Sequence, residues 1–426
     1  MNRPRLGAKI ALASALAATC ALAACGAPQP VGPAATGLQG AGSLDDVLAA
    51  KNGKMPWAMV SVVAHDNDLS GSDYHYTAAA RSLAGIPGLY SAMVLDTPGQ
   101  DGVSVLGFNG QSISNRDKEI NSGSAEFVGS FLTWAGRNLP ADNRMLVMAD
   151  HGGGIVRGIM VDDSSGHAGI RIPDLAGVLA EQHAQILTFD ACLMQMVEVA
   201  YEVRKGADVV VAAESVTYAG SWPYQAVGRA MSGGASPEQT ARKIVDAIGP
   251  EVYRSTISAV STAGSEATAT ALDRLAQAAL ARMKQDPAFK EALASAIRRG
   301  QSYKFNDDPR FALYHGYRDI ISTARQIAKL PDPEVSGAAK ALEAAAKQMV
   351  IRSWRDESTY PESYGIAFYA PVDGTVDLGY ARNASLAKDT QWDEFLVALN
   401  SRGNFGNPLQ KDKYPGAFPR LIYPGR

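Results

Sequence analysis

Short runs of aliphatic residues alternate with segments of helical periodicity through the first half of the chain. The runs carry little charge and cover residues 57–64, 89–95, 102–108, 144–149, 185–189, 207–213 and 256–261. Apolar residues recur at helical spacing in segments 124–139 and 173–182 and again after residue 196. Strands buried on both faces have continuous apolar sequences, and their alternation with helices favours a parallel or mixed sheet covered by helices. The pattern therefore predicts an α/β fold.

The pattern changes near residue 265, where alanine-rich helical sequence begins. Helices are expected over 267–299, 311–330 and 336–351, and strand character returns over 363–370. We therefore expect two structural units. An α/β domain covers residues 51–265, and a helix-rich C-terminal region with one or more returning strands covers residues 266–426.

The first 25 residues have the layout of an export signal. A positively charged start precedes an apolar run over residues 10–24, which is too short to span a bilayer comfortably. The run ends in Leu22-Ala23-Ala24-Cys25, which resembles the lipobox of bacterial lipoproteins. Residues 1–25 are therefore expected to be a signal peptide cut before a lipidated Cys25, with a simple cleavable signal as the alternative. Residues 26–50, rich in Gly, Ala and Pro, are expected to be a flexible linker.

Such a protein is exported and lipid-anchored to the cell envelope, so that a membrane is one of its partners. Gly26 and Ala27 follow the cysteine directly, with no aspartate, and in a bacterium with two membranes we therefore expect the outer one. The formal net charge is only −3, and no basic block with interleaved aromatic residues is present. Nucleic acid is therefore not expected as a partner.

Two of the apolar runs are followed directly by residues with reactive or ionisable side chains. Residues 144–149 are followed by Asp150-His151-Gly152-Gly153-Gly154, and residues 185–189 by Asp190-Ala191-Cys192. Open α/β sheets place their sites at the carboxyl ends of strands. Of the three cysteines, Cys20 leaves with the signal and Cys25 would be lipidated, so Cys192 is the only thiol left for the folded part. We interpret Cys192 and His151 as a Cys/His dyad, with a small buried side chain as the alternative for the cysteine.

A thiol attacks a carbonyl well only as thiolate, and a histidine supplies the base that activates it and the acid that protonates the leaving group. Negative charge on the carbonyl oxygen needs rigid donors. Gly152 has no side chain to obstruct its N–H group, and the N–H of Cys192, expected at the start of a helix, is the second donor.

The pair DHGGG and FDACLMQMVEVAYE resembles the clostripain-like cysteine peptidases, which belong with caspases, gingipains and legumains. The segments WAMVSVVAHDNDL, VDDSSGHAGIRIPDLAGVL, AAESVTYAGSWPY and ESYGIAFYAP are similar to further family segments in the same order. The resemblance implies a caspase-like α/β/α sandwich over residues 51–265. It departs from the family where Ala64-His65 precede Asp66, since the opening strand of the family often ends Gly-Asp-Asn.

Carried onto this chain, the resemblance implies a general base at His151, a nucleophile at Cys192 and an oxyanion-hole glycine at Gly152. Asp190 matches the acid that lines the primary specificity pocket. The implied activity is cleavage of proteins or peptides after basic residues, through a thioester acyl-enzyme. Arginine is preferred over lysine because its two parallel N–H donors match a carboxylate. For Asp190 the alternative is a structural carboxylate that stabilises the turn, and Glu214 could add charge to the same rim.

The same residues also occur in other classes of protein. His-Gly-Gly-Gly also forms oxyanion holes in serine esterases, but the chain contains no Gly-x-Ser-x-Gly elbow. A non-catalytic or transpeptidase-type caspase-like surface lipoprotein remains the alternative. The chemistry requires no cofactor and we assign no metal ligands. Calcium is left open at Asp66-Asn67-Asp68 and Asp162-Asp163-Ser164, although such loop carboxylates more often form turns.

Overall fold

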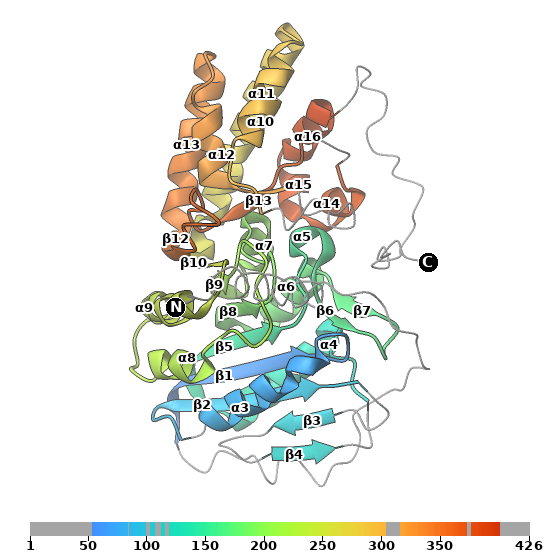
Figure 1. Cartoon of the computed structure of the whole chain (residues 1–426), viewed down its shortest axis with the longest axis vertical. Coiled ribbons are helices and arrows are strands. Elements are labelled where there is room, and N and C mark those ends of the chain that lie inside the picture. Colours follow the sequence, from blue (N-terminus) through green and yellow to red (C-terminus); the bar gives the residue numbers. More distant parts are fainter. Residues whose placement is uncertain are drawn as a thin grey trace, which may run out of the picture.

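The computed structural model describes residues 53–83, 85–98, 103–106, 112–115, 119–303, 316–372 and 376–400. In these residues nine strands form one sheet, in the order β12-β10-β9-β8-β5-β1-β2-β3-β4 (Figure 1). Strands β9, β8, β5, β1 and β2 run parallel, and antiparallel strands extend both edges. The bounds are β1 (Met55–Ala64), β2 (Leu89–Asp96), β3 (Val103–Leu106), β4 (Ser112–Asn115), β5 (Ala141–Ala149), β8 (Ala184–Asp190), β9 (Ala207–Ala212), β10 (Thr256–Ser261) and β12 (Val350–Arg355).

Alternate residues of each central strand pack into different hydrophobic layers. Ala58 and Val60 of β1 belong to the cluster formed with α4 (Ala125–Asn138), α6 (Ile172–Gln182) and α7 (Val197–Val203). Trp57 and Met59 belong to the opposite cluster, formed with α3 (Asp73–Leu83), α8 (Tyr224–Met231) and α9 (Pro237–Ile248). Since both faces of these strands are buried, their sequences are continuous apolar runs. The mostly parallel α/β sandwich expected from the sequence is confirmed.

Local signals set several helix ends. Ser124 accepts a hydrogen bond from the N–H of Phe127 and so caps α4, as its position predicts. The helix expected over 267–299 is divided into α10 (Ser265–Gln285) and α11 (Phe289–Arg298), because Asp286-Pro287 interrupts it. Within the described part of the segment 311–330, helix α12 (Ile320–Ile327) begins late, because Asp319 caps it by accepting from the N–H of Ser322 at 2.6 Å.

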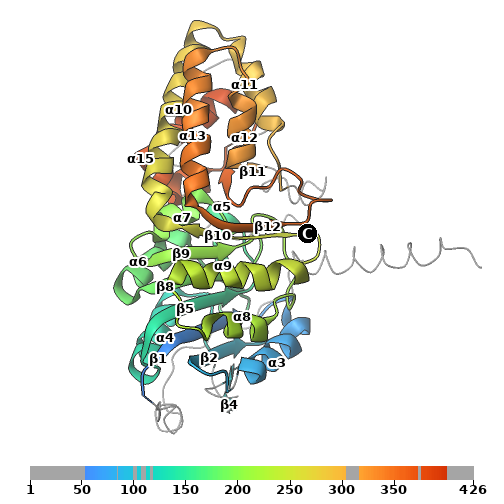
Figure 2. The same ribbon diagram turned by 90° about the vertical axis from the view of Figure 1, so that its left-hand side faces the viewer.

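The C-terminal helices stack beyond the β12 edge of the sheet, as both views show (Figures 1 and 2). Helix α13 (Pro333–Met349) packs against α10 and α12 and leads directly into β12. One hydrophobic cluster continues from the sheet into these helices, with Leu187, Leu272 and Leu342 among its members. The remaining elements are α5 (Gly154–Arg157), β6 (Ile159–Asp162), β7 (Ala168–Ile170), β11 (Tyr317–Asp319), β13 (Ala367–Tyr369), α14 (Leu378–Asn383), α15 (Ser385–Asp389) and α16 (Trp392–Asn400).

The predicted signal peptide with Cys25 and the linker 26–50 lie outside the described residues. Among the helices that the structure does describe, none has both the length and the apolar character that a membrane crossing demands. The domain boundary at residue 265 stays a prediction.

Candidate active site

Strands β5 and β8 are neighbours and parallel, so their carboxyl ends meet at one edge of the sheet. Ala149 pairs with Asp190 in their register, and the N–H of Asp150 donates to the carbonyl of Asp190 at 3.3 Å. The residues that follow the two strands therefore leave the sheet side by side. His151 and Cys192 line the same small cavity, of about 10 Å³, together with Leu69, Tyr76, Asp190 and Thr217 among others. This volume is room for about one water molecule.

The imidazole of His151 is held by a carboxylate that the sequence did not single out for this contact. Nε2 of His151 lies 2.7 Å from Oδ1 of Asp68, in the loop after β1. Burial lowers the pKa of His151, but the hydrogen bond to Asp68 and the negative charges of Asp150, Asp68 and Cys192 outweigh it and raise this pKa to about 9. Because both residues line the same small cavity, the thiol and the imidazole lie within electrostatic reach of each other.

Asp150 anchors the turn that carries the histidine. It is buried, its Oδ1 accepts from the side-chain amide of Asn67 at 2.8 Å, and its Oδ2 accepts from the N–H of Val161. Burial raises the pKa of Asp150 to about 6, opposed mainly by the nearby charges of His151 and His65. Asp150 thus joins the His151 turn to the β1 loop and to β6.

Cys192 is buried in an irregular segment between β8 and α7. Its Sγ lies 3.4 Å from both the N–H and the carbonyl oxygen of Thr217, which follows β9. The segment is further fixed by hydrogen bonds from the N–H groups of Leu193 and Gln195 to the carbonyls of Ser215 and Ala213, both at 3.0 Å. The expectation that Cys192 starts a helix is wrong, because α7 begins only at Val197.

Gly152 lies directly against the cysteine segment. A Cβ atom at this position would come within 2.4 Å of the carbonyl oxygen of Cys192, so only glycine fits without displacement. Gly152 also pairs with Ile159 through hydrogen bonds made by its neighbours His151 and Gly153. In such a pair the N–H of the central residue points away from the partner strand. The backbone thus leaves the Gly152 N–H directed away from β6, while the residue itself touches the cysteine turn.

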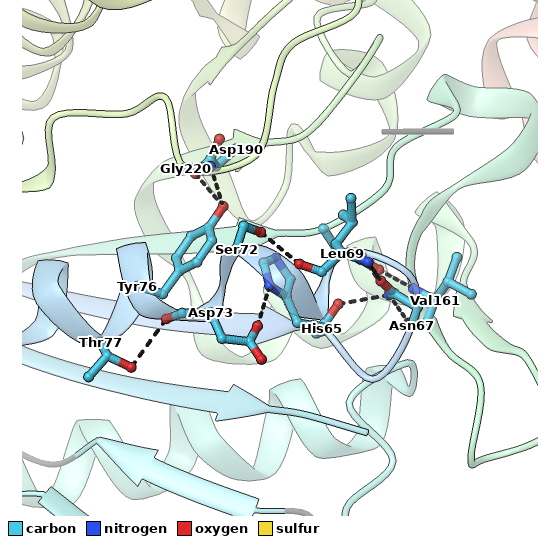
Figure 3. Close-up of polar contacts among 12 residues, drawn as sticks. His65, Asn67, Leu69, Ser72, Asp73, Tyr76, Thr77, Val161, Asp190 and Gly220 are labelled. Atoms are coloured by element: carbon cyan, nitrogen blue, oxygen red, sulfur yellow. Dashed lines mark hydrogen bonds and ion pairs between the residues drawn. The ribbon is translucent and has the colours of Figure 1, made fainter. Parts of the chain in front are cut away.

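Asp190 lines the cavity, and two tyrosines hold one of its oxygens. The hydroxyl groups of Tyr76 and Tyr224 both donate to Oδ2 at 3.0 Å. Figure 3 shows Tyr76 reaching from α3 toward Asp190 and Gly220. The other oxygen, Oδ1, is buried without a hydrogen-bond partner among the described residues. Burial raises the pKa of Asp190 to about 6, and the two hydroxyl groups oppose this rise.

Glu214 does not lie on the rim of this cavity, contrary to the sequence-based suggestion. Its carboxylate is buried and accepts from the hydroxyl of Tyr303 at 2.5 Å and from that of Ser363 at 2.8 Å. These partners come from the C-terminal region. Glu214 therefore joins that region to the end of β9.

A comparison with known proteins decides the family. The model of the clostripain family, peptidase C11, matches residues 101–399. The chain belongs to the clostripain family. This confirms the resemblance stated above, and it places the chain among cysteine peptidases.

The individual relatives of this clostripain-family chain are distant. Clostripain from Hathewaya histolytica is 34% identical over 128 residues, which are 26% of this chain and 24% of that protein. The chain thus spans about a quarter of the length of this curated relative. Two crystal structures share the fold at 19% identity. One is an inactive zymogen of a C11 protease from Parabacteroides distasonis, with a TM-score of 0.59 over 82% of this chain and 99% of the other. The second is a secreted C11 cysteine protease from Bacteroides thetaiotaomicron in complex with an irreversible peptide inhibitor, with a TM-score of 0.58 over 81% and 99%.

Four carboxylates of this clostripain-family chain gather beside the His151 loop. Asp66, Asp96, Glu119 and Asp162 each offer one oxygen, and these four atoms lie within 4.8 Å of one another. All four donors are hard oxygen ligands, which suit calcium or magnesium rather than zinc or copper. The sequence pointed to the loops of Asp66 and Asp162 but missed Asp96 and Glu119.

Three other histidines of the clostripain-family chain contact carboxylates. His65, which lines the cavity, contacts Asp73 through Nδ1 at 2.8 Å, and His167 contacts Asp163 at 2.6 Å. His183 lies 3.3 Å from Asp208 at the surface. His315 lies outside the described residues.

Proposed function

We propose that this chain is a cysteine endopeptidase that cleaves after basic residues, arginine before lysine. One observation carries the proposal. Two neighbouring parallel strands bring Cys192 and His151 to one cavity, which also contains the buried and half-satisfied carboxylate of Asp190. Membership of a cysteine peptidase family supports the chemistry, and the open Oδ1 of Asp190 supports the specificity.

In the proposed reaction the proton of the Cys192 thiol passes to His151, and the sulfur attacks the carbonyl carbon of the scissile peptide bond. The N–H groups of Gly152 and Cys192 stabilise the oxyanion. His151 then gives its proton to the leaving amine, the C–N bond breaks, and a thioester remains. Water, deprotonated by His151, attacks the thioester and releases the new carboxyl group and the free thiol.

Asp190 would recognise the substrate side chain on the acyl side of the scissile bond. Tyr76 and Tyr224 occupy Oδ2, so Oδ1 is the oxygen left to accept from the substrate. A guanidinium group offers several N–H donors in a fixed fork, which explains a preference over the ammonium group of lysine. The cavity now has room for about one water, so its walls must move apart when a substrate binds.

Tyr76 lines both this cavity and a second one. On its other side lies a second cavity of about 330 Å³, lined by residues that include Trp222, Tyr224 and Arg229. A shift of the Tyr76 ring would join this space to the catalytic cavity. The combined volume would reach the range that accommodates ligand groups.

Turnover of a fluorogenic arginine substrate tests the chemistry. Changing Cys192 or His151 to alanine is expected to lower kcat/KM by at least about 100-fold, because either change removes the activated nucleophile. Circular dichroism of each variant serves as the folding control. Turnover within a few-fold of wild type in either variant would refute the assignment.

We further propose that the protein is exported and anchored by lipid at Cys25. The lipobox-like sequence supports this, and the Bacteroides thetaiotaomicron relative is described as secreted. Mass spectrometry of the mature N-terminus from native membranes is expected to show an acylated Cys25. An unmodified N-terminal residue at another position would contradict the anchor.

A further inference from the structure

A second histidine, His65, lines the catalytic cavity and has no role in the proposed reaction. It is the first residue after β1, and β1 and β5 are parallel neighbours in the sheet. The residues that follow these two strands, His65 and His151 among them, therefore leave the sheet at the same edge. Both imidazole side chains line the cavity together with Cys192 and Asp190.

His65 is also the residue at which this chain departs from the family pattern. The opening strand of the clostripain-like peptidases often ends Gly-Asp-Asn, whereas here His65 precedes Asp66 and Asn67. A glycine at this position would contribute no side chain to the cavity. The imidazole therefore adds a polar ring to the cavity wall of this chain.

The ring of His65 is fully buried and is held from two sides. Its Nδ1 lies 2.8 Å from Oδ1 of Asp73. Its edge packs against Tyr76, with the two ring centroids 4.7 Å apart and an angle of 84° between the planes. Figure 3 shows both neighbours of the imidazole. Because the hydroxyl of Tyr76 donates to Asp190 at 3.0 Å, a single tyrosine contacts both His65 and the pocket carboxylate.

The contact with Asp73 determines what the other ring nitrogen can do. A carboxylate only accepts hydrogen bonds, so Nδ1 carries the proton, and Nε2 of the neutral ring is then an acceptor. Nε2 of His65 is buried and has no hydrogen-bond partner among the described residues. Since a buried acceptor without a donor is costly, this atom points to a ligand that supplies the donor.

Asp190 presents a second acceptor of this kind. Its Oδ2 is occupied by the hydroxyl groups of Tyr76 and Tyr224, whereas Oδ1 is buried and unpartnered in the described part of the chain. His65 and Asp190 line a cavity of only about 10 Å³. A group that enters between these two side chains therefore lies near both acceptors.

Two buried acceptors suit a guanidinium group better than an ammonium group. Guanidinium has five N–H donors spread over three nitrogens in a fixed plane, whereas ammonium carries its three donors on one atom and can turn them toward water. Loss of one acceptor would leave a guanidinium N–H buried and unpaired. An arginine substrate should therefore suffer more from this loss than a lysine substrate.

We propose that His65 is a specificity-determining residue, whose Nε2 accepts a hydrogen bond from the guanidinium group of the substrate arginine. Asp190 supplies the balancing charge, and His65 supplies the second acceptor. His65 touches the substrate but takes no part in breaking or forming covalent bonds. This inference rests on the proposed function and adds a second recognition group to it.

Two substitutions of His65 separate the roles of its ring nitrogens. His65→Asn keeps an N–H donor for Asp73 and removes the acceptor at Nε2, whereas His65→Gln places an amide oxygen near Nε2 and loses the donor. We measure kcat/KM for matched arginine and lysine peptides at about pH 8.5, where an ordinary histidine is neutral. We expect His65→Asn to lower the value for arginine at least about tenfold and that for lysine by no more than about threefold. His65→Gln should keep both values within about threefold of wild type.

The control is His183→Asn, which changes a histidine at the surface and should leave both values as they are. Thermal unfolding of each variant checks the fold. Equal losses for arginine and lysine in His65→Asn, or the same loss in His65→Gln, would show that His65 only supports the cavity wall and would overturn the inference. An arginine value close to wild type in His65→Asn would overturn it as well.

Nuclear magnetic resonance tests the contact with His65 in place. Wild type labelled isotopically at its histidine ring nitrogens is reacted with an acyloxymethyl ketone that carries an arginine side chain and, separately, with the lysine counterpart. The signals of His65 are those missing from the spectrum of His65→Gln. We expect Nε2 of His65 to move to lower frequency in the arginine adduct, as an acceptor nitrogen does on hydrogen bonding, and to move less in the lysine adduct. An arginine adduct on Cys192 with an unmoved Nε2 would refute the role of His65 and leave the proposed function standing. If no adduct forms on Cys192, the proposed function is wrong and this inference falls with it.

Discussion

Two groups of buried carboxylates lie near the same edge of the sheet, and they differ in how their charge is balanced. Asp190 is a single carboxylate with two tyrosine hydroxyl groups on one oxygen. The cluster of Asp66, Asp96, Glu119 and Asp162 places four carboxylates around the donors of two serines. The first group therefore has one buried negative charge to balance, which in the proposed function a substrate side chain would do. The second group has up to four such charges to balance.

The pKa values express the same difference. Burial is the main cause in both places, yet it raises the pKa of Asp190 only to about 6 and that of Asp96 to about 9. Asp96 is raised further by its acidic neighbours, whereas Asp190 is stabilised by Tyr76 and Tyr224. At neutral pH, Asp190 is therefore mostly ionised, whereas Asp96 is mostly protonated.

Among the predicted effects, the largest is expected from Asp190→Asn. This substitution keeps the shape of the side chain and removes its charge. The specificity constant for arginine substrates should fall about 100-fold, because the guanidinium loses a buried charged partner. The constant for a neutral substrate should change little. The ratio of the two specificity constants is the measurement. An unchanged ratio would make Asp190 a turn-stabilising residue.

A smaller effect is expected from pH. Because the pKa of Asp190 is raised to about 6, protonation removes its charge as pH falls through that value. The KM for an arginine substrate should rise roughly tenfold between pH 7 and pH 5, while that for a neutral substrate stays level. In the Asp190→Asn variant, the KM values for the arginine and the neutral substrate should depend on pH in the same way. A parallel pH profile for both substrates would contradict the role of this carboxylate.

The contribution of Asp190 to folding stability should fall as pH rises, whereas its contribution to the binding of an arginine substrate should increase. The folded state holds the proton of Asp190 more tightly than the unfolded state, whose pKa is near 3.8. The contribution to stability is therefore fully present below pH 3.8 and is lost as pH rises to about 6. The proposed recognition of arginine would thus depend on a buried charge that lowers the stability of the folded state at neutral pH.

Much of the site could be predicted because it lies at strand ends. Continuous apolar runs mark buried strands, and the first polar residues after them identify Asp150, His151, Asp190 and Cys192. The fold class follows from the same pattern. Such residues can be predicted from the sequence because one short segment contains both the apolar strand and the reactive side chains that follow it.

The partners of these residues could not be predicted, because they come from distant segments. Tyr76 fits the apolar face of a helix, and nothing local shows that its hydroxyl reaches Asp190. Asp96 resembles an ordinary strand end followed by a turn, and Glu119 lies in a segment without periodicity. The start of α7 was misplaced because the backbone carbonyls of Ala213 and Ser215, which follow β9, hold the cysteine segment out of the helix.

Covalent labelling tests the central claim, that Cys192 is the nucleophile of an arginine-directed site, most directly. An acyloxymethyl ketone carrying an arginine side chain is incubated with wild type and with Cys192→Ala, and the modified peptide is mapped by mass spectrometry. We expect one adduct on Cys192 in wild type, slower labelling by the same reagent built on a neutral residue, and no adduct in Cys192→Ala. An adduct at another residue, or equal labelling of the variant, would contradict the assignment.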